Sequence, residues 1–286
     1  MAKQELMNLF LSKDFVTRYK LAERVTGPFA QILVNYSGVA QNTRPPVILD
    51  HACGTGVVSD ALVHSLDLQT IKSWDLTCGD ISPGLVEYMS RKIQDEGWPN
   101  AKAKLVDAQD TKLPTGHFTH IFAAFALVGF PNPAAALREC LRILQPGGTL
   151  AISNWQLPEW IVIAKAAVET MPGNLPFPTV KEFLSKLNEG WDSEEPTRAH
   201  LQREGFDAIE VETVTQKISL PQSTLVELII PILPFILSHF WTQEQRKEYE
   251  KDIPTALQRY LAERYGADGD VLVEPRVIIA TARKPC

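Results

Sequence analysis

VILDHACGTG, at residues 47–56, is a short apolar run that ends at an acid and enters a glycine-rich turn. An apolar run of this length is typical of a strand buried in a parallel sheet. Gly54 and Gly56 let the backbone approach a ligand closely, because glycine has no β-carbon. Residues 57–65 have the pattern of a helix, whose first N–H groups would face the same turn. The stretch therefore predicts a strand, a ligand-binding loop and a helix in succession.

The same succession repeats along the chain. Further apolar runs predict strands and the amphipathic stretches between them predict helices, with strands at 74–79, 103–106, 118–125 and 149–155 and helices at 84–97 and 133–144. Strands that alternate with helices form parallel sheets with right-handed crossovers. We therefore predict an α/β fold built on one doubly wound sheet.

The second half of the chain departs from this alternation. Two stretches read mainly as helices and two as the last strands, the helices at 157–207 and 222–265 and the strands at 208–220 and 271–283. We predict that residues 1–286 form a single domain, with an N-terminal helical cap over 1–45 and a ligand-binding core over 46–156. The helical insertions should cover the carboxyl edge of the sheet, where such folds bind ligands.

Composition excludes several classes of protein. The chain has 286 residues, of which 45% are hydrophobic, so a full core can form and disorder is excluded. The formal net charge of −6 makes a nucleic-acid partner unexpected. The four cysteines form no CxxC pair, which suits a reducing compartment, and the six histidines show no metal-ligand spacing. We therefore expect a cytoplasmic protein that binds neither metal nor nucleic acid, and the sequence predicts no oligomeric state.

One apolar segment, LVELIIPILPFILSHFW at residues 225–241, is nearly long enough to span a bilayer. It also holds Glu227, Pro231 and Pro234, and the two prolines would break the helical hydrogen-bond ladder inside hydrocarbon. We therefore expect a buried helix or a lid over the ligand site, and no membrane partner.

Two ligands compete for the glycine-rich loop. A dinucleotide needs the GxGxxG fingerprint, and Ser59 occupies the third glycine position, so the fingerprint of a nicotinamide oxidoreductase is incomplete. S-adenosylmethionine has no phosphate and needs polar groups near the loop instead. Acids occur at the ends of three successive predicted strands, at Asp50, Asp80 and Asp107. Asp80 is placed to accept from both ribose hydroxyls and Asp107 from an adenine amino group, which favours S-adenosylmethionine.

With these motifs, residues 19–155 resemble the class I S-adenosylmethionine-dependent methyltransferases. The resemblance rests on the glycine-rich loop and on four further stretches, Asp80-Ile81-Ser82, Val106-Asp107-Ala108, the strand at 118–125 and the turn at 144–148. It implies a Rossmann-like sheet that is mostly parallel, with one antiparallel strand near the C-terminus and helical lid insertions.

The resemblance also implies that S-adenosyl-L-methionine is the cofactor and methyl donor, with S-adenosyl-L-homocysteine as its product. The residues that it places around the donor are Tyr19, Asp50, His51, Ala52, Gly54, Asp80, Ile81, Ser82, Leu85, Asp107, Ala108, Gln109, Phe125 and Ala126. In this family the tyrosine of an N-terminal Arg-Tyr pair, here Tyr19, closes over the donor.

Further stretches resemble fungal methyltransferases of secondary metabolism, in particular those of the gliotoxin bis-thiomethyltransferase type. These stretches are DFVTRYK at 14–20, GDISPGLVEY at 79–88 and FWTQEQRKEYEKDIP at 240–254. The resemblance implies S-methylation of the thiols of a small molecule, a reduced epidithiodiketopiperazine. Two alternatives stay open: an N- or O-methyltransferase of a related fungal metabolite, and a regulator of secondary metabolism that binds the donor without transferring methyl.

No general base stands out in the sequence. His51 is the only histidine that the motifs place near the donor, and it can equally order the loop through a hydrogen bond. A thiol acceptor tolerates a weak base, because its pKa of about 8.5 leaves a small fraction as thiolate at neutral pH. Aromatic side chains suit a flat, apolar acceptor pocket, and the candidates are Phe15, Trp155, Trp160 and Phe177.

Overall fold

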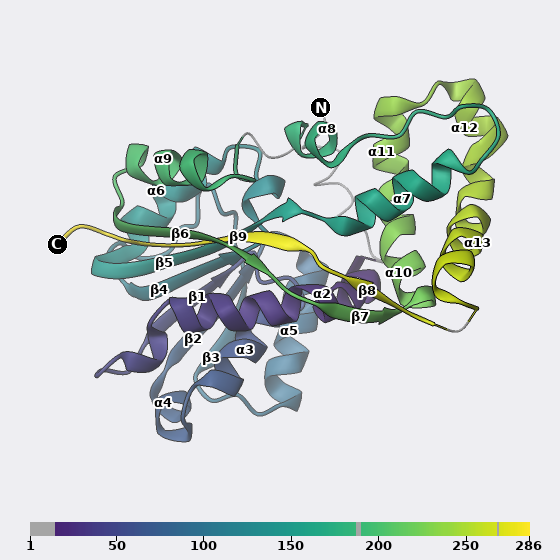
Figure 1. The fold of residues 1–286 in the computed structure, drawn as a ribbon. Coiled ribbons are helices and arrows are strands. Elements are labelled where there is room, and N and C mark those ends of the chain that lie inside the picture. The colour runs from purple at the N-terminus through teal and green to yellow at the C-terminus, as the bar shows by residue number, and fades with distance from the viewer. Residues whose placement is uncertain (1–14, 187–189, 268) are drawn as a thin grey trace.

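The computed structural model describes residues 15–186, 190–267 and 269–286, and within these ranges seven strands form one sheet in the order β3-β2-β1-β4-β5-β9-β6 (Figure 1). The strands are β1 (Val47–His51), β2 (Asp75–Asp80), β3 (Ala101–Leu105), β4 (Phe118–Ala124), β5 (Leu144–Leu157), β6 (Asp207–Thr215) and β9 (Arg276–Arg283). Strand β9 is antiparallel to β5 and β6, and the pairs among β1 to β5 are parallel. This arrangement confirms the predicted doubly wound, mostly parallel sheet with one antiparallel strand near the C-terminus.

The strand order reverses at the centre of the sheet, between β1 and β4. Strands β2 and β3 extend the sheet on one side of this pair, and β5 extends it on the other. Asp50 in β1 is level with Cys78 in β2 and with Phe122 in β4, so the carboxyl ends of these strands meet at one edge. Open α/β sheets bind ligands outside this edge at the point of reversal.

Helices cover both faces of the sheet (Figure 1). On one face lie α2 (Phe15–Tyr36), α3 (Val57–Ser65) and α5 (Pro83–Asp95), and on the other lie α6 (Pro133–Ile143) and α9 (Glu194–Arg203). Alternate residues of β4 face the two hydrophobic cores: Phe122 belongs to the same buried cluster as Leu33 of α2, and Ile121 to the same cluster as Leu137 of α6. Both layers therefore hold the central strands rigidly.

A second group of helices lies beyond the carboxyl edge, mostly on the right of Figure 1, with α8 at its top centre. It comprises α7 (Glu159–Glu169), α8 (Val180–Ser185), α10 (Gln222–Ile229), α11 (Leu233–Phe240), α12 (Gln243–Tyr249) and α13 (Ile253–Tyr265). Short 3₁₀ turns occur here and in the core, at η1 (Val39–Gln41), η2 (Leu127–Gly129), η3 (Ile230–Ile232) and η4 (Glu250–Asp252). These helices fall within the stretches 157–207 and 222–265 that were predicted as helical insertions, but α9 of the first stretch lies on the sheet instead.

Two details of the prediction were wrong. The expected strands at 208–220 and 271–283 are each broken in two, because β7 (Ile218–Pro221) and β8 (Asp270–Val273) leave the main sheet and pair with each other. Pro275 lies between β8 and β9, where it has no N–H to donate to a ladder. The helix α4 (Leu68–Ser73) was not predicted either. Its N-cap is Asp67, whose side chain accepts from the amides of Gln69 and Thr70.

The apolar segment of the second helical group is α10, η3 and α11 in succession. By length and composition alone, Gln222–Phe240 could cross a membrane, and 33% of it is buried in the protein. Leu225, Leu228 and Ile232 of this segment line a cavity at the carboxyl edge of the sheet. The segment thus contributes to the wall of the site described next.

Candidate active site

The glycine-rich loop after β1 is shaped by residues with positive φ. Gly54 has φ of 56° and Gly56 has φ of 88°, a conformation that side chains rarely adopt. The ring of Tyr19 lies against Gly54 so closely that a β-carbon there would be 2.6 Å from its Cε1. Lys92 holds the far side of the loop, because its Nζ donates to the carbonyl of Thr55 at 3.2 Å. The loop is therefore fixed by tyrosine on one side and lysine on the other.

Asp80, at the end of β2, joins this loop to the next one. Its Oδ2 accepts from the amide of Gly54 at 3.0 Å, and its Oδ1 accepts from the amide of Ser82 at 2.9 Å. Burial raises the pKa of Asp80, and these backbone hydrogen bonds act against that rise. Each carboxylate oxygen keeps lone pairs for a ligand hydroxyl, and the side chain lines the cavity.

Asp50, which the resemblance places around the donor, lies behind the loop and not on the wall of the cavity. Its carboxylate is buried behind the loop, where Oδ2 accepts from the amide of Ser59 at 3.1 Å and from its hydroxyl at 2.7 Å. Burial raises the pKa of Asp50 to about 7. Asp50 thus holds the start of α3 and does not line the cavity. Ser59 was singled out in the sequence only because it replaces the third glycine of the dinucleotide fingerprint. In the structure it supplies both hydrogen-bond donors to Asp50.

His51 is buried behind the wall of the cavity and does not line it. The residue is 1% exposed, and its ring packs edge-on against Phe130 with centroids 6.1 Å apart. Burial lowers the pKa of His51 to about 4, so the imidazole is neutral. Because the side chain enters the core and does not line the cavity, the structure gives no support to His51 as the general base.

The segment after β3 brings Asp107, Ala108 and Gln109 to the cavity wall. Asp107 Oδ1 accepts from the amide of Gln109 at 2.9 Å, and Gln109 Oε1 accepts from the amide of Asn132 at 2.8 Å. The segment is thus tied to the start of α6.

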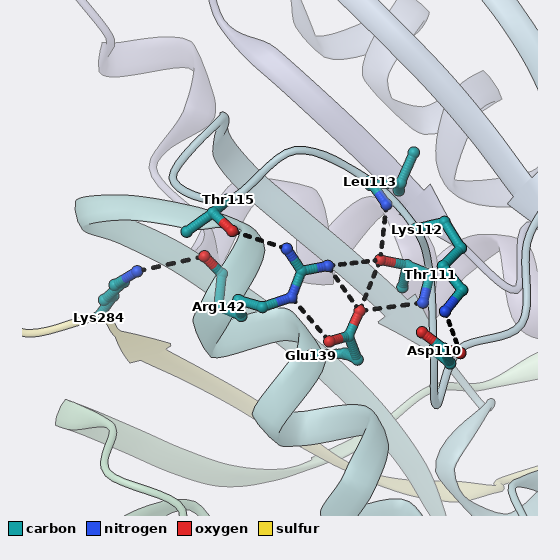
Figure 2. Close-up of polar contacts among 8 residues, drawn as sticks. All are labelled: Asp110, Thr111, Lys112, Leu113, Thr115, Glu139, Arg142 and Lys284. Atoms are coloured by element: carbon teal, nitrogen blue, oxygen red, sulfur yellow. Dashed lines mark hydrogen bonds and ion pairs between the residues drawn. The ribbon is translucent and has the colours of Figure 1, made fainter.

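Figure 2 shows the network that anchors the continuation of this segment to α6. Glu139 Oε2 accepts from the amide of Thr111 at 3.0 Å and from its hydroxyl at 2.7 Å. Arg142 donates to both carboxylate oxygens of Glu139, from Nε to Oε1 and from Nη2 to Oε2, each at 2.8 Å. Its Nη1 donates to the hydroxyl of Thr115 at 2.8 Å. The hydrogen bond from Arg142 lowers the pKa of Glu139 to about 2. The network therefore stays charged throughout the neutral range.

These segments enclose a cavity of about 300 Å³, within the range of small-molecule sites. Of the residues predicted around the donor, those on its wall are Tyr19, Ala52, Gly54, Asp80, Ile81, Leu85, Asp107, Ala108, Gln109, Phe125 and Ala126. Ser82 does not line the cavity. Its backbone amide donates to Asp80, and it occupies the N-cap position of α5 without a side-chain capping hydrogen bond. These wall residues provide the carboxylate of Asp80 beside the glycine turn, together with apolar side chains. This combination fits the ribose and the adenine of S-adenosylmethionine.

The other half of the cavity is apolar and aromatic. Phe125 has φ of 55°, and its ring stacks on Trp155 with centroids 4.4 Å apart. Trp155 and Trp160 line the cavity as predicted for the acceptor side. Phe177 does not, because it is buried in the core among the second group of helices. Phe15 begins α2, but its side chain lies outside the described part of the structure.

Several wall residues were not predicted from the sequence. They come from the second group of helices and from the small sheet, and they include Glu159, Leu220, Leu225, Leu228, Ile232 and Val273. Glu159 could have been found by extending the rule that selected Asp80 and Asp107, since it follows the carboxyl end of β5. In the described ranges, no group of three or more His, Cys, Asp or Glu side chains is arranged to hold a metal ion.

Comparison with known proteins agrees with this geometry. Residues 48–148 match a methyltransferase domain family. The chain is 72% identical to the acetylaranotin bis-thiomethyltransferase of Aspergillus terreus over 100% of both proteins. It is 47% identical to the methyltransferase tpcH of Aspergillus fumigatus over 98% of this chain and 100% of that protein.

Solved structures are similar at the level of the fold alone. The phosphoethanolamine N-methyltransferase 2 of Haemonchus contortus, in complex with S-adenosyl-L-methionine, matches with a TM-score of 0.58 at 14% identity. The match covers 96% of this chain and 58% of that chain.

Proposed function

The chain belongs to the S-adenosylmethionine-dependent methyltransferases, and from this premise we propose that it S-methylates both thiols of a reduced epidithiodiketopiperazine. The observation that carries the proposal is the 72% identity, over 100% of both chains, to a protein named as a bis-thiomethyltransferase. The aromatic half of the cavity supports it, because Trp155 and Trp160 line it and aromatic rings suit a flat, apolar acceptor.

We assign the donor to the half of the cavity around Asp80. The ribose hydroxyls would donate to the carboxylate of Asp80, and the adenine amino group to Asp107. The loop at Gly54 would hold the amino-acid end of the donor, with the ring of Tyr19 packed across it. Asp50 supports this loop from behind through Ser59, which explains why an acid is useful there without touching the ligand.

The remaining work of the protein is alignment and exclusion of water. The sulfonium of the bound donor supplies an already activated methyl group. The walls position the thiol sulfur in line with that methyl and keep water out. A free thiol has a pKa of about 8.5, so a small fraction is ionised at neutral pH even without help from the protein.

We further propose that residues 1–286 work as one domain, in the cytoplasm, on a small molecule and without a nucleic-acid or membrane partner. Strand β9, from the end of the chain, lies between β5 and β6, which supports a single unit. The four cysteines are unbonded, which supports a reducing compartment.

The test is mass spectrometry of the purified protein with S-adenosylmethionine and three acceptors. These are a reduced epidithiodiketopiperazine, a reduced monothiol and an amide analogue without thiols. Methyl transfer to the dithiol, with release of S-adenosylhomocysteine, supports the proposal. Transfer to the amide analogue alone would indicate an N-methyltransferase. Donor binding without transfer to any acceptor would favour a regulator.

A further inference from the structure

One acid on the cavity wall has no part in the donor site described above. The charged wall residues are Asp80, Asp107 and Glu159, and the first two lie at the ends of β2 and β3. Glu159 instead begins α7 and shares its half of the cavity with Trp155 and Trp160. Among the described residues that form the wall, none is a histidine, lysine, arginine or cysteine. Glu159 is thus the ionisable group on the acceptor side.

We propose that Glu159 accepts the proton of the acceptor thiol as the methyl group is transferred, an inference that rests on the proposed function. The proposal concerns a catalytic residue, because Glu159 would touch the reacting sulfur.

The backbone of a distant segment orients this carboxylate. Glu159 Oε2 accepts a hydrogen bond from the amide of Glu274, in the turn between β8 and β9. That bond engages one oxygen and leaves Oε1 available to a ligand. Val273 and Pro275, on either side of Glu274, line the same cavity. The side chain of Glu274 itself pairs with Lys217 at 3.4 Å, on the exposed surface.

The chemistry suits a proton transfer that accompanies bond formation. A thiol of pKa about 8.5 is mostly protonated near pH 7, so little thiolate is present before the methyl group is transferred. As the sulfur lone pair forms the new S–CH₃ bond, however, the S–H becomes strongly acidic. The proton then passes to the carboxylate, while the electron pair of the old CH₃–S⁺ bond returns to the donor sulfur.

The charge balance of this step favours an apolar cavity. A sulfonium cation and a carboxylate anion are present before the transfer, and a neutral thioether and a neutral carboxylic acid are present after it. The walls near Glu159 include Leu225, Leu228 and Ile232, which stabilise neutral products over separated charges. The proton then leaves Glu159 for solvent when the product departs.

The test compares Glu159→Gln with Glu169→Gln, a matched change on the exposed side of the same helix, where Glu169 pairs with Lys165 at 2.7 Å. Glutamine keeps an oxygen for the amide of Glu274 and removes the charge. We expect Glu159→Gln to lower kcat about 10²-fold near pH 7, with donor affinity in calorimetry unchanged. The loss should shrink near pH 9.5, about one unit above the thiol pKa of about 8.5, because the thiolate then forms in solution. Glu159→Asp should recover part of the activity.

The outcomes separate the two proposals. Wild-type protein that methylates no thiol would overturn the proposed function and the role of Glu159 with it. Wild-type turnover together with normal kcat in Glu159→Gln would overturn the role of Glu159 alone. So would a loss that is equal near pH 7 and near pH 9.5, or a rise in acceptor KM with kcat unchanged, because a residue that only positions the acceptor gives those results.

Discussion

Replacing Asp80 by Asn should weaken donor binding strongly while leaving the shape of the site nearly intact. Both carboxylate oxygens of Asp80 accept backbone amides, from Gly54 at 3.0 Å and from Ser82 at 2.9 Å. Asparagine has one oxygen and one NH₂ group, so one of these two backbone N–H groups would lie opposite the side-chain NH₂ and lose its hydrogen-bond acceptor. A buried N–H without an acceptor costs about 1–3 kcal/mol of stability.

The loss in affinity comes from the ligand hydroxyls. Hydrogen bonds to a charged group contribute about 1.5–3 kcal/mol each, against about 0.5–1.5 kcal/mol for neutral partners. Two ribose hydroxyls would therefore lose about 2–3 kcal/mol together, which raises the donor Kd by about 30- to 150-fold. Isothermal titration calorimetry with S-adenosylmethionine measures this directly, and thermal unfolding measures the loss of stability.

Asp75→Asn is the matched control, because Asp75 begins the same strand and pairs on the surface with Lys102 at 2.6 Å. That pair contributes about 0–1 kcal/mol, and the residue is far from the carboxyl edge. Donor affinity of Asp80→Asn within about threefold of the wild type, a difference below 1 kcal/mol, would refute the assignment of Asp80 to the ribose.

Three further changes test the supports of the site. Glu139→Gln should weaken donor binding about 3- to 10-fold, because it loosens the segment that follows Asp107. Glu87→Gln, in an exposed pair with Arg91, is the control and should leave donor affinity unchanged. Equal donor affinities of the two variants in calorimetry would contradict this role of Glu139. Gly54→Ala places a β-carbon 2.6 Å from the ring of Tyr19, at a residue whose φ is +56°. Donor affinity should therefore fall about tenfold and the free energy of unfolding by about 1–2 kcal/mol. Wild-type values in both calorimetry and thermal unfolding would count against the close contact. Burial raises the pKa of Asp50 from 3.8 to about 7, so between these pH values the folded protein holds a proton that the unfolded chain releases. The free energy of unfolding should therefore fall as the pH rises from about 4 to about 7, by up to about 1.4 kcal/mol per pH unit. Asp50→Asn should show a shallower slope in thermal unfolding over that window, and an unchanged slope would contradict the assignment.

The donor half of the cavity was predictable because its signals are local. Asp80 and Asp107 each follow a strand whose apolar run is visible in the sequence, and parallel strands bring their carboxyl ends to one edge. The glycines of the loop mark a turn that needs no distant contact to be recognised. Together with the family resemblance, these signals predicted a doubly wound, mostly parallel sheet and named most of the donor wall, but they did not give the strand order.

The acceptor half depends on contacts between distant segments, which no local pattern reveals. Glu159 is held by an amide 115 positions further along the chain. Phe177 and Trp160 are equally aromatic in the sequence, yet only Trp160 reaches the cavity, because packing of the helices decides which ring is buried. His51 was misplaced for the same reason, since the direction of a side chain at a strand end follows from the tertiary core.

The central claim is that one cavity carries out two successive methyl transfers to a dithiol. A time course by mass spectrometry, with wild-type protein, excess S-adenosylmethionine and a reduced epidithiodiketopiperazine, tests it most directly. The account predicts a singly methylated species that rises and falls, a doubly methylated product that accumulates, and two molecules of S-adenosylhomocysteine for each dithiol consumed. Unchanged dithiol beside protein that binds the donor normally would contradict it.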